Sequence, residues 1–322
     1  MTYTIHHGNC LDILPTLPAN SVDLIATDPP YYKVKGEAWD RQWDTPQGFL
    51  SWLDTVLAEL YRVLKPNGSL YMFASPKMAA RVEVLIAGRF NVLNGIRWVK
   101  EAGWHNKAEK ETLRSYLSPW EHVIFAEHYG ADGYAKGEAG YTAKCDELRG
   151  FVFEPLRAYL AGERNRAGLT TQDIAEAWRI KTGNTNRTGQ AGHWFEQVQW
   201  TLPTAANYEW LRQTMSNLNH GGQYLRREYE DLRREYEDLR RPFNVSADVP
   251  YTDVWTFKTV NAYPGKHPTE KPLAMMRHII EASSREGATV LDCFMGGGTT
   301  GIAARDTGRH FIGIEKDERY FT

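Results

Sequence analysis

The stretch Ser21–Tyr31 reads SVDLIATDPPY, an apolar run followed by an acid, two prolines and an aromatic residue. The apolar run predicts a short strand buried on both faces, which is typical of a parallel sheet. Pro29 and Pro30 end this strand, because proline has no backbone N–H and fixes φ. The stretch therefore predicts rigid carbonyl acceptors beside Asp28 at the C-terminal end of a strand, where open α/β sheets bind their ligands.

A carboxylate beside fixed carbonyls suits the activation of an exocyclic amino group on a nucleobase. The lone pair of such an amine is delocalised into the ring, so acceptors that hold its hydrogens stabilise the positive charge of the transition state. Asp28 and the Pro29 carbonyl are the candidate acceptors, and Tyr31 is a candidate to stack on a base swung out of the duplex. The alternative is a strand followed by a polar turn. The motif resembles the Asp-Pro-Pro-Tyr of the amino-methylating DNA methyltransferases.

A second signal lies near the C-terminus, where residues 290–301 read VLDCFMGGGTTG. The pattern predicts a strand, a glycine turn and a helix, so that the backbone can approach a ligand and the helix N-terminus can favour its carboxylate. Residues 311–315 predict a further strand, and its terminal Glu315 follows Gly296 by nineteen residues. This spacing suits a carboxylate that binds ribose hydroxyls. A dinucleotide site would look similar, but the turn lacks a third glycine at dinucleotide spacing.

The order of the motifs resembles the beta group of amino-methylating DNA methyltransferases. Asp-Pro-Pro-Tyr comes first, and the segment HPTEKP at residues 267–272 and the glycine turn come last. The resemblance covers about residues 4–128 and 250–322 and implies a Rossmann-like α/β fold that binds S-adenosylmethionine. It implies these cofactor-binding residues: Asn9, Cys10, Lys271, Asp292, Phe294, Gly296, Gly298, Thr299 and Glu315. Asn9 departs from the family pattern, which usually has an aspartate there.

The activity that the resemblance implies is transfer of a methyl group from S-adenosylmethionine to the N6 amino group of adenine in double-stranded DNA. The transfer is direct, with no covalent enzyme intermediate. N4-cytosine methylation is the closest alternative, in which serine usually replaces Asp28. A dinucleotide-dependent oxidoreductase and a non-enzymatic helix-turn-helix regulator are alternatives from other classes. The motif order argues against the first, and the intact Asp28, Gly296 and Glu315 argue against the second.

The chain divides into three segments. Helices at 49–64 and 78–87 alternate with strands at 69–74, 92–99 and 121–126, which predicts parallel βαβ units. The alternation stops after residue 128. We predict the catalytic half of a methyltransferase domain at 1–150, a helical target-recognition insertion at 151–245 and the cofactor-binding half at 246–322. The chain ends just after Glu315, where relatives of the family usually continue into a further helix, so we expect this last helix to be missing and stability to be compromised.

The insertion carries the candidate DNA contacts. Residues 166–177 resemble the first half of a helix-turn-helix, and residues 177–195 contain no acid. Cations there would hold phosphates and amides would read base edges. The candidates are Lys181, Asn184, Asn186, Arg187 and Gln190. The alternative is a small structural subdomain. Two identical heptads, LRREYED, begin at Leu225 and predict one long charged helix that stops before Pro242.

Composition bears on how the protein could bind DNA, a metal ion or a membrane. A net charge of −2 gives no overall basic excess, so any DNA contact must come from local patches. The three cysteines have no metal-binding spacing, which predicts no metal site and a reduced, cytoplasmic setting. No apolar run approaches membrane-spanning length, so no membrane partner is expected. The sequence does not decide whether the protein is a homodimer or has a partner restriction nuclease.

Overall fold

The computed structural model describes residues 1–34, 36–101, 109–128, 152–183, 191–197, 199–219, 221–245, 249–261 and 263–321. The chain forms two compact units. The sheet unit combines Met1–His128 with Pro242–Thr322, and the helical unit is Tyr129–Arg241. The helical unit thus begins earlier than the predicted insertion of residues 151–245 and ends slightly sooner.

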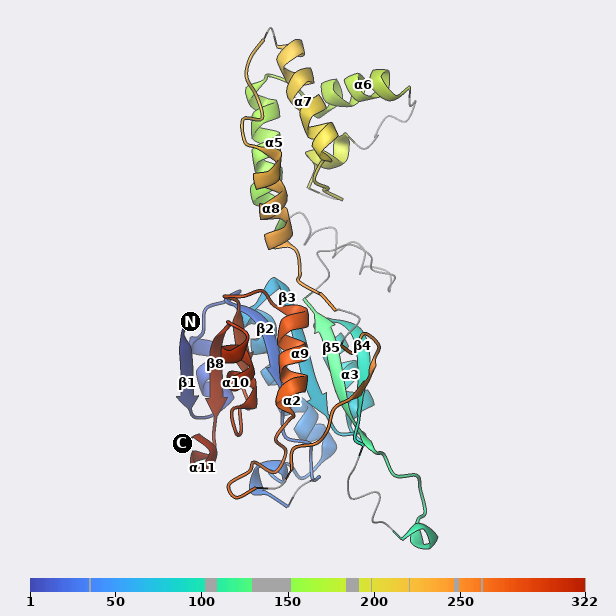
Figure 1. Cartoon of the computed structure of the whole chain (residues 1–322), viewed down its shortest axis with the longest axis vertical. Coiled ribbons are helices and arrows are strands. Elements are labelled where there is room, and N and C mark those ends of the chain that lie inside the picture. Colours follow the sequence, from blue (N-terminus) through green and yellow to red (C-terminus); the bar gives the residue numbers. More distant parts are fainter. Residues whose placement is uncertain are drawn as a thin grey trace. The chain divides into compact units, whose positions relative to one another are not determined.

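The sheet unit is built on one eight-stranded sheet with the order β1-β8-β7-β2-β3-β5-β4-β6 (Figure 1). Its strands are β1 (Tyr3–His7), β2 (Val22–Thr27), β3 (Leu64–Ala74), β4 (Asn91–Val99), β5 (Trp120–Glu127), β6 (Val254–Thr256), β7 (Thr289–Asp292) and β8 (His310–Glu315). Its α-helices are α1 (Cys10–Ile13), α2 (Pro46–Val63), α3 (Ala79–Ala87), α9 (Leu273–Ser283), α10 (Thr299–Asp306) and α11 (Glu318–Phe321). Contrary to the expectation that the last helix is missing, a short helix, α11, follows Glu315.

Strand direction follows the predicted pattern at the centre of the sheet and departs from it at β5. The strand β2 pairs in parallel with β3 and β7, and β8 pairs in parallel with β7 and β1. The strand β5 is antiparallel to both of its neighbours, β3 and β4. Between β4 and β5 the described residues form only the short 3-10 helix η4 (Lys110–Thr112). A parallel pair needs a longer crossover, usually a helix, whereas an antiparallel pair does not.

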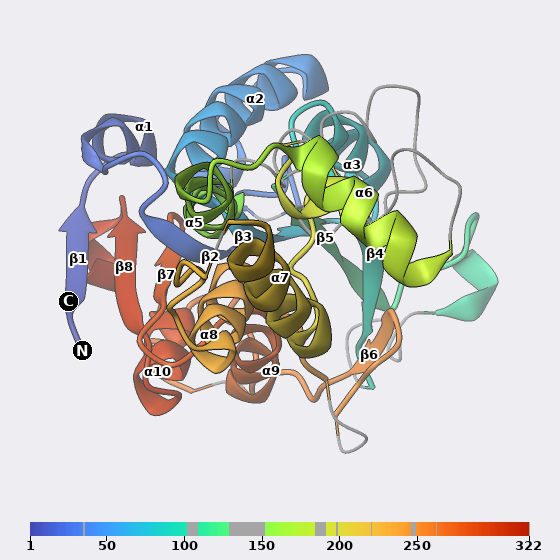
Figure 2. The ribbon, with the colours of Figure 1, turned by 90° about the horizontal axis from the view of Figure 1, so that it is seen from above.

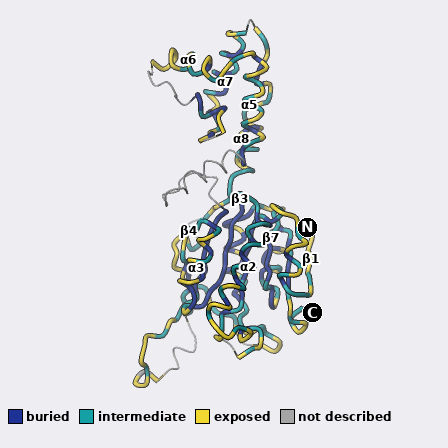
Figure 3. Tube along the Cα trace, turned by 180° about the vertical axis from the view of Figure 1, so that it is seen from behind, coloured by how far each residue is buried: buried dark blue, intermediate teal, exposed yellow. Residues whose placement is uncertain are grey.

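Helices cover both faces of the sheet, and each face has its own apolar core. Figure 2 shows α2 and α3 on one face and α9 and α10 on the other. The helix α2 begins at the cap residue Thr45, whose side chain accepts a hydrogen bond from the Gly48 N–H. Apolar residues at helical spacing, such as Phe49, Leu53 and Leu60, then bury one face of it. The central strands are buried on both sides, as Figure 3 shows in dark blue.

The helical unit contains α5 (Glu154–Arg166), α6 (Thr171–Thr182), α7 (Ala205–Leu218) and α8 (Tyr229–Leu239) around a separate apolar core. The turn between α5 and α6 ends at Thr170, which forms a capping box with Asp173. The helix predicted to begin at Leu225 begins only at Tyr229, so the predicted start is wrong. Leu225 is buried with φ near +50°, and its N–H donates to Glu163 Oε2 at 2.6 Å. This tertiary contact outweighs the helical preference of the first heptad.

The described residues contain neither a membrane-spanning helix nor a group of metal-binding side chains. None of the helices described above is long and apolar enough to cross a membrane. Within the same residues, no group of histidine, cysteine, aspartate and glutamate side chains could hold a metal ion.

Candidate active site

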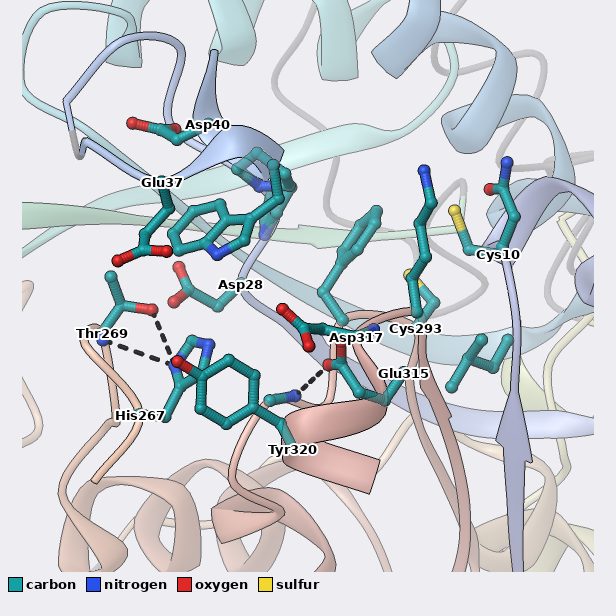
Figure 4. A pocket seen from close by; sticks show the side chains of 18 of the residues that line it. Cys10, Asp28, Glu37, Asp40, His267, Thr269, Cys293, Glu315, Asp317 and Tyr320 are labelled. Atoms are coloured by element: carbon teal, nitrogen blue, oxygen red, sulfur yellow. Dashed lines mark hydrogen bonds between the residues drawn. The ribbon is translucent and has the colours of Figure 1, made fainter. Parts of the chain in front are cut away.

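Three neighbouring strands bring carboxylates to one edge of the sheet. Asp292 ends β7, Glu315 ends β8, and Asp28 directly follows β2. Because these strands are parallel and adjacent, their carboxyl ends lie together. A cavity of about 760 Å³ lies at this edge and is lined by Asp28 and Glu315 (Figure 4). The other predicted site residues that line it are Asn9, Cys10, Pro29, Pro30, Tyr31, Phe294 and Gly296.

Asp28 is largely buried and bound to a lysine. Its side chain is 15% exposed, and its Oδ2 accepts a hydrogen bond from Lys271 Nζ. Among the described residues, no donor bonds to the buried Oδ1 atom. Burial raises the pKa of Asp28, and the charge of Lys271 opposes this shift. Asp28 therefore combines one oxygen held by a cation with one buried oxygen that has no partner among the described residues.

Lys271 lies between two carboxylates. Besides Asp28 it contacts Glu121 Oε2 at 3.4 Å and donates to the Thr269 carbonyl at 3.1 Å. Burial alone would lower the pKa of Lys271, but Asp28 and Glu121 outweigh burial and raise it. The sequence predicted a cofactor contact for Lys271. The structure instead pairs its ammonium group with Asp28, although Lys271 also lines a small cavity of about 40 Å³ with Asp292, Thr299 and Gly296.

Glu121, near the start of β5, connects this pair to Tyr31. Its Oε2 accepts from the Tyr31 hydroxyl at 3.0 Å, and its Oε1 accepts from Lys100 Nζ. Burial raises the pKa of Glu121, but Lys271 and Lys100 together lower it to about 2. Tyr31 is only 7% exposed, and Lys271 Nζ lies 5.3 Å from the centre of its ring. The candidate stacking residue is thus held at both its hydroxyl and its ring.

The loop after Tyr31 is fixed by Asp40, a fully buried acid that ends the 3-10 helix η2 (Ala38–Asp40). Asp40 Oδ1 accepts from the Tyr31 N–H at 2.6 Å, and Oδ2 accepts from the Val34 N–H at 2.6 Å. Its neighbour Trp39 lines the cavity and stacks on His267 with ring centres 6.0 Å apart. The loop therefore forms part of the cavity wall.

The glycine turn and Glu315 form another part of the wall. Glu315 Oε2 accepts from the Gly296 N–H at 2.7 Å, and Oε1 accepts from the Asp317 N–H at 2.7 Å. Gly296 has φ near +52°, and a Cβ atom there would meet the His267 ring at 3.2 Å. Glycine is thus favoured by the left-handed conformation, and the His267 ring leaves little room for a larger residue. The His267 ring also packs edge-on against Tyr320 of α11, with ring centres 4.4 Å apart.

Asp292 lies beside Asp28 in the sheet but has different surroundings. Its carboxylate accepts from Thr27 Oγ1 at 2.8 Å, from Thr300 Oγ1 at 2.6 Å and from the Phe294 N–H at 3.1 Å. Burial raises the pKa of Asp292 to about 6. These contacts tie the end of β7 to β2 and to α10. Asp292 therefore shapes the turn rather than lining the large cavity.

The remaining predicted cofactor residues lie at the starts of two helices, α1 and α10. Asn9 caps α1, and its Oδ1 accepts from the Leu11 N–H at 3.1 Å. Cys10 is buried, and burial raises the pKa of its thiol to about 12, so it remains protonated. Gly298, with φ near +79°, is the N-cap of α10, and Thr299 is the first residue of that helix.

The predicted DNA contacts are only partly covered by the structure. Lys181 lies in the last turn of α6, with Nζ 4.7 Å from the Trp178 ring centre and 4.9 Å from that of Trp210. Asn184, Asn186, Arg187 and Gln190 lie outside the described residues.

Sequence reasoning gave no role to several residues of the site: Glu121, Asp40, Trp39 and Tyr320. His267 begins the segment HPTEKP, which the sequence singled out, but it received no role of its own. One signal was present, because Glu121 is an acid at the start of the strand 121–126, whose residues after His122 are apolar. Nothing local indicates that this acid meets Tyr31, which is 90 positions away in the sequence.

Comparison with known families decides the identity of this fold and site. The model of the N6/N4 DNA methylase family matches residues 22–322. The chain belongs to this family. The predicted resemblance to amino-methylating DNA methyltransferases is confirmed.

Two curated relatives match nearly the whole chain. The DNA adenine methyltransferase YhdJ of Escherichia coli (strain K12) is 29% identical over 98% of this chain and 79% of its own length. The type II methyltransferase M1.MboII of Moraxella bovis is 27% identical over 98% of this chain and 92% of its own length. Both are methyltransferases by name.

Solved structures confirm the predicted Rossmann-like methyltransferase fold. The PvuII DNA methyltransferase, which is cytosine-N4-specific, matches with a TM-score of 0.54 at 13% identity, over 100% of this chain and 84% of that chain. A protein from Thermus thermophilus, described as a DNA modification methylase, matches with a TM-score of 0.51 at 19% identity, over 99% of this chain and 90% of that chain.

Proposed function

We propose that this DNA methylase transfers a methyl group from S-adenosylmethionine to the N6 amino group of adenine in double-stranded DNA. The observation that carries the proposal is Asp28, which lines a large cavity at the strand ends. Lys271 holds its Oδ2, and its buried Oδ1 has no partner among the described residues. An orphaned carboxylate oxygen in a cavity is an acceptor for a ligand N–H.

Asp28 has a defined task in this proposal. Its Oδ1 accepts a hydrogen bond from the target amino group, and its charge stabilises the positive charge that develops on the nitrogen as the new N–C bond forms. The adjoining Pro29 carbonyl is the second acceptor. Lys271 keeps the buried carboxylate ionised by supplying the opposite charge. The proton released from the nitrogen passes to the carboxylate or to water.

The residues of the cavity fit S-adenosylmethionine, which supplies the methyl group when bound. Glu315 provides a carboxylate for ribose hydroxyls, and Phe294 provides an apolar wall. Gly296 leaves open the space that a Cβ atom would fill beside His267. The N-terminus of α10, at Gly298 and Thr299, suits the cofactor's carboxylate. The Asn9 oxygen caps α1, so the amide nitrogen of Asn9 is the group left to donate a hydrogen bond to the cofactor.

Adenine is preferred over cytosine for two reasons. The family resemblance associates aspartate at position 28 with N6-adenine and serine with N4-cytosine, and the relative from Escherichia coli is named an adenine methyltransferase. The test is to incubate the protein with methyl-labelled cofactor and unmethylated DNA and to identify the labelled nucleoside. N6-methyladenine supports the proposal, whereas N4-methylcytosine or an unlabelled product contradicts it.

Replacement of Asp28 separates catalysis from cofactor binding. Asp28→Ala should reduce methyl transfer by about 10²–10³ or more, because an electrostatic stabiliser of the transition state is lost. Cofactor affinity should stay within a few-fold of the parent value. Cofactor titration and the transfer assay on one preparation measure both, and an equal loss of both would give Asp28 a structural role.

We propose that the helical unit selects the DNA sequence. Lys181 lies on α6, which follows a capped turn typical of helix-turn-helix motifs, and the segment after it carries Asn184, Asn186, Arg187 and Gln190. Lys181→Ala should weaken binding to all sequences alike and reduce the salt slope by about one. Loss of a base-reading amide should instead relax the choice at one position by about 1–3 kcal/mol.

Methylated-site profiles of the three amide variants, Asn184→Ala, Asn186→Ala and Gln190→Ala, decide where the sequence is read. If all three keep the parent profile at every position, recognition lies elsewhere. The cytoplasmic location stays a prediction, and the questions of a homodimer and of a partner restriction nuclease stay open.

A further inference from the structure

The carboxylate of Glu121 binds three groups at once around Asp28. Its Oε1 accepts from Lys100, and its Oε2 accepts from the Tyr31 hydroxyl at 3.0 Å and lies 3.4 Å from Lys271 Nζ. The side chain of Glu121 is 16% exposed, and that of Lys271 is 7% exposed. Glu121 therefore contacts the lysine that binds Asp28 and the aromatic residue beside it, without contacting Asp28 through a hydrogen bond of its own.

Lys271 Nζ is held by three oxygen neighbours. It donates hydrogen bonds to Asp28 Oδ2 and to the Thr269 carbonyl, and it forms an ion pair with Glu121 Oε2 at 3.4 Å. Without Glu121 the lysine would lose one of its two carboxylate partners, and its flexible side chain would have another arrangement open to it.

We propose that Glu121 is a positioning residue for methyl transfer, which holds Lys271 on Asp28 Oδ2 and fixes the Tyr31 ring, so that the Asp28 carboxylate keeps one orientation at the cavity. This inference rests on the proposed function of Asp28. Charge supports it, since two carboxylates and two lysines balance within the cluster, and a buried ion cluster is stable only when its members are paired.

The first experiment replaces Glu121 by glutamine, which keeps the shape and the acceptor for Tyr31 but removes the charge. Glu121→Gln should slow single-turnover methyl transfer by up to about 10²-fold, the scale of a small misplacement of reacting groups. Cofactor affinity should not change. The matched control is Glu127→Gln, since Glu127 is a buried glutamate on the same strand that bonds to Asn91. This control should behave like the parent.

The pH dependence gives a signature that a merely structural residue would not produce. The titratable groups around Asp28 are Glu121, Lys271, Lys100, Tyr31 and the neighbouring Asp292. Loss of the negative charge in Glu121→Gln lowers the pKa of Asp28, so the acidic limb of the rate profile should move to lower pH. Loss of the positive charge in Lys271→Met should move it to higher pH, by about one unit or more.

A measurement on the protein alone keeps this inference distinct from the proposed function. The titration of the Asp28 carboxyl can be followed by ¹³C NMR with labelled aspartate, and the signal is assigned by its loss in Asp28→Asn. The pKa of Asp28 should fall in Glu121→Gln and rise in Lys271→Met. Both shifts are expected whether or not the substrate is adenine. Shifts in the same direction, or a parent-like rate and titration in Glu121→Gln, would overturn the proposal.

Discussion

The ends of β2 and β7 lie side by side in the sheet, and each carries a buried aspartate with a different environment. Asp292 has three hydrogen-bond donors, from β2, from α10 and from the backbone just after β7, all neutral. Asp28 has one charged donor on one oxygen and, among the described residues, none on the other. A satisfied carboxylate stabilises the fold, whereas a carboxylate with an unused oxygen in a cavity is available for chemistry. The difference between the two ends lies in the bonding, not in the residue type.

Glu315, at the end of the next strand, extends this comparison to a third acid. Each oxygen accepts one backbone N–H at 2.7 Å, and the carboxylate also lines the cavity. Glu315→Gln should weaken cofactor binding by about 1–3 kcal/mol, because a charge-assisted hydrogen bond is lost and an amide has only one acceptor oxygen. DNA affinity should barely change. Calorimetric titration of the cofactor measures the effect, and an unchanged dissociation constant would remove Glu315 from the site.

Asp292 should affect stability in a pH-dependent manner. Its pKa is about 6 in the folded protein and near 3.8 when unfolded, so the folded state holds a proton that the unfolded state releases between these values. Stability from this group is therefore full at low pH and is lost as the pH rises. Asp292→Asn cannot titrate, so the parent should lose about 2 kcal/mol relative to the variant between about pH 4.5 and about pH 7.5.

Urea unfolding of both proteins at the two pH values measures this difference. A constant difference across the range would mean that Asp292 keeps an ordinary pKa and that its burial costs nothing.

The sequence predicted the centre of the site because its parts are local. Asp28, Asp292 and Glu315 each follow an apolar run directly, and parallel strands bring such ends together. Pro29 and Pro30 mark the end of β2 in the sequence, and the glycine turn marks the end of β7. The same reasoning predicted the sheet and its covering helices, since each depends on a pattern within about twenty residues.

The missed features depend on contacts between distant segments. Glu121 joins the site only because β5 is antiparallel, a direction that the alternation of helices and strands did not predict. In the helical unit, the two identical heptads also differ in structure because of a contact with a distant residue. Leu232 of the second copy lies in α8, whereas Leu225 of the first is bound by Glu163 and is not helical. Identical local sequence therefore gave different structure.

The most direct test of the account compares Asp28→Asn with Asp292→Asn, two isosteric changes on adjacent strands. Single-turnover methyl transfer to adenine should be measured at saturating cofactor for both variants and the parent. We predict a loss of at least about 10² for Asp28→Asn and a rate within a few-fold of the parent for Asp292→Asn. Equal losses, or the larger loss in Asp292→Asn, would contradict the assignment of Asp28 as the residue that binds the target amino group.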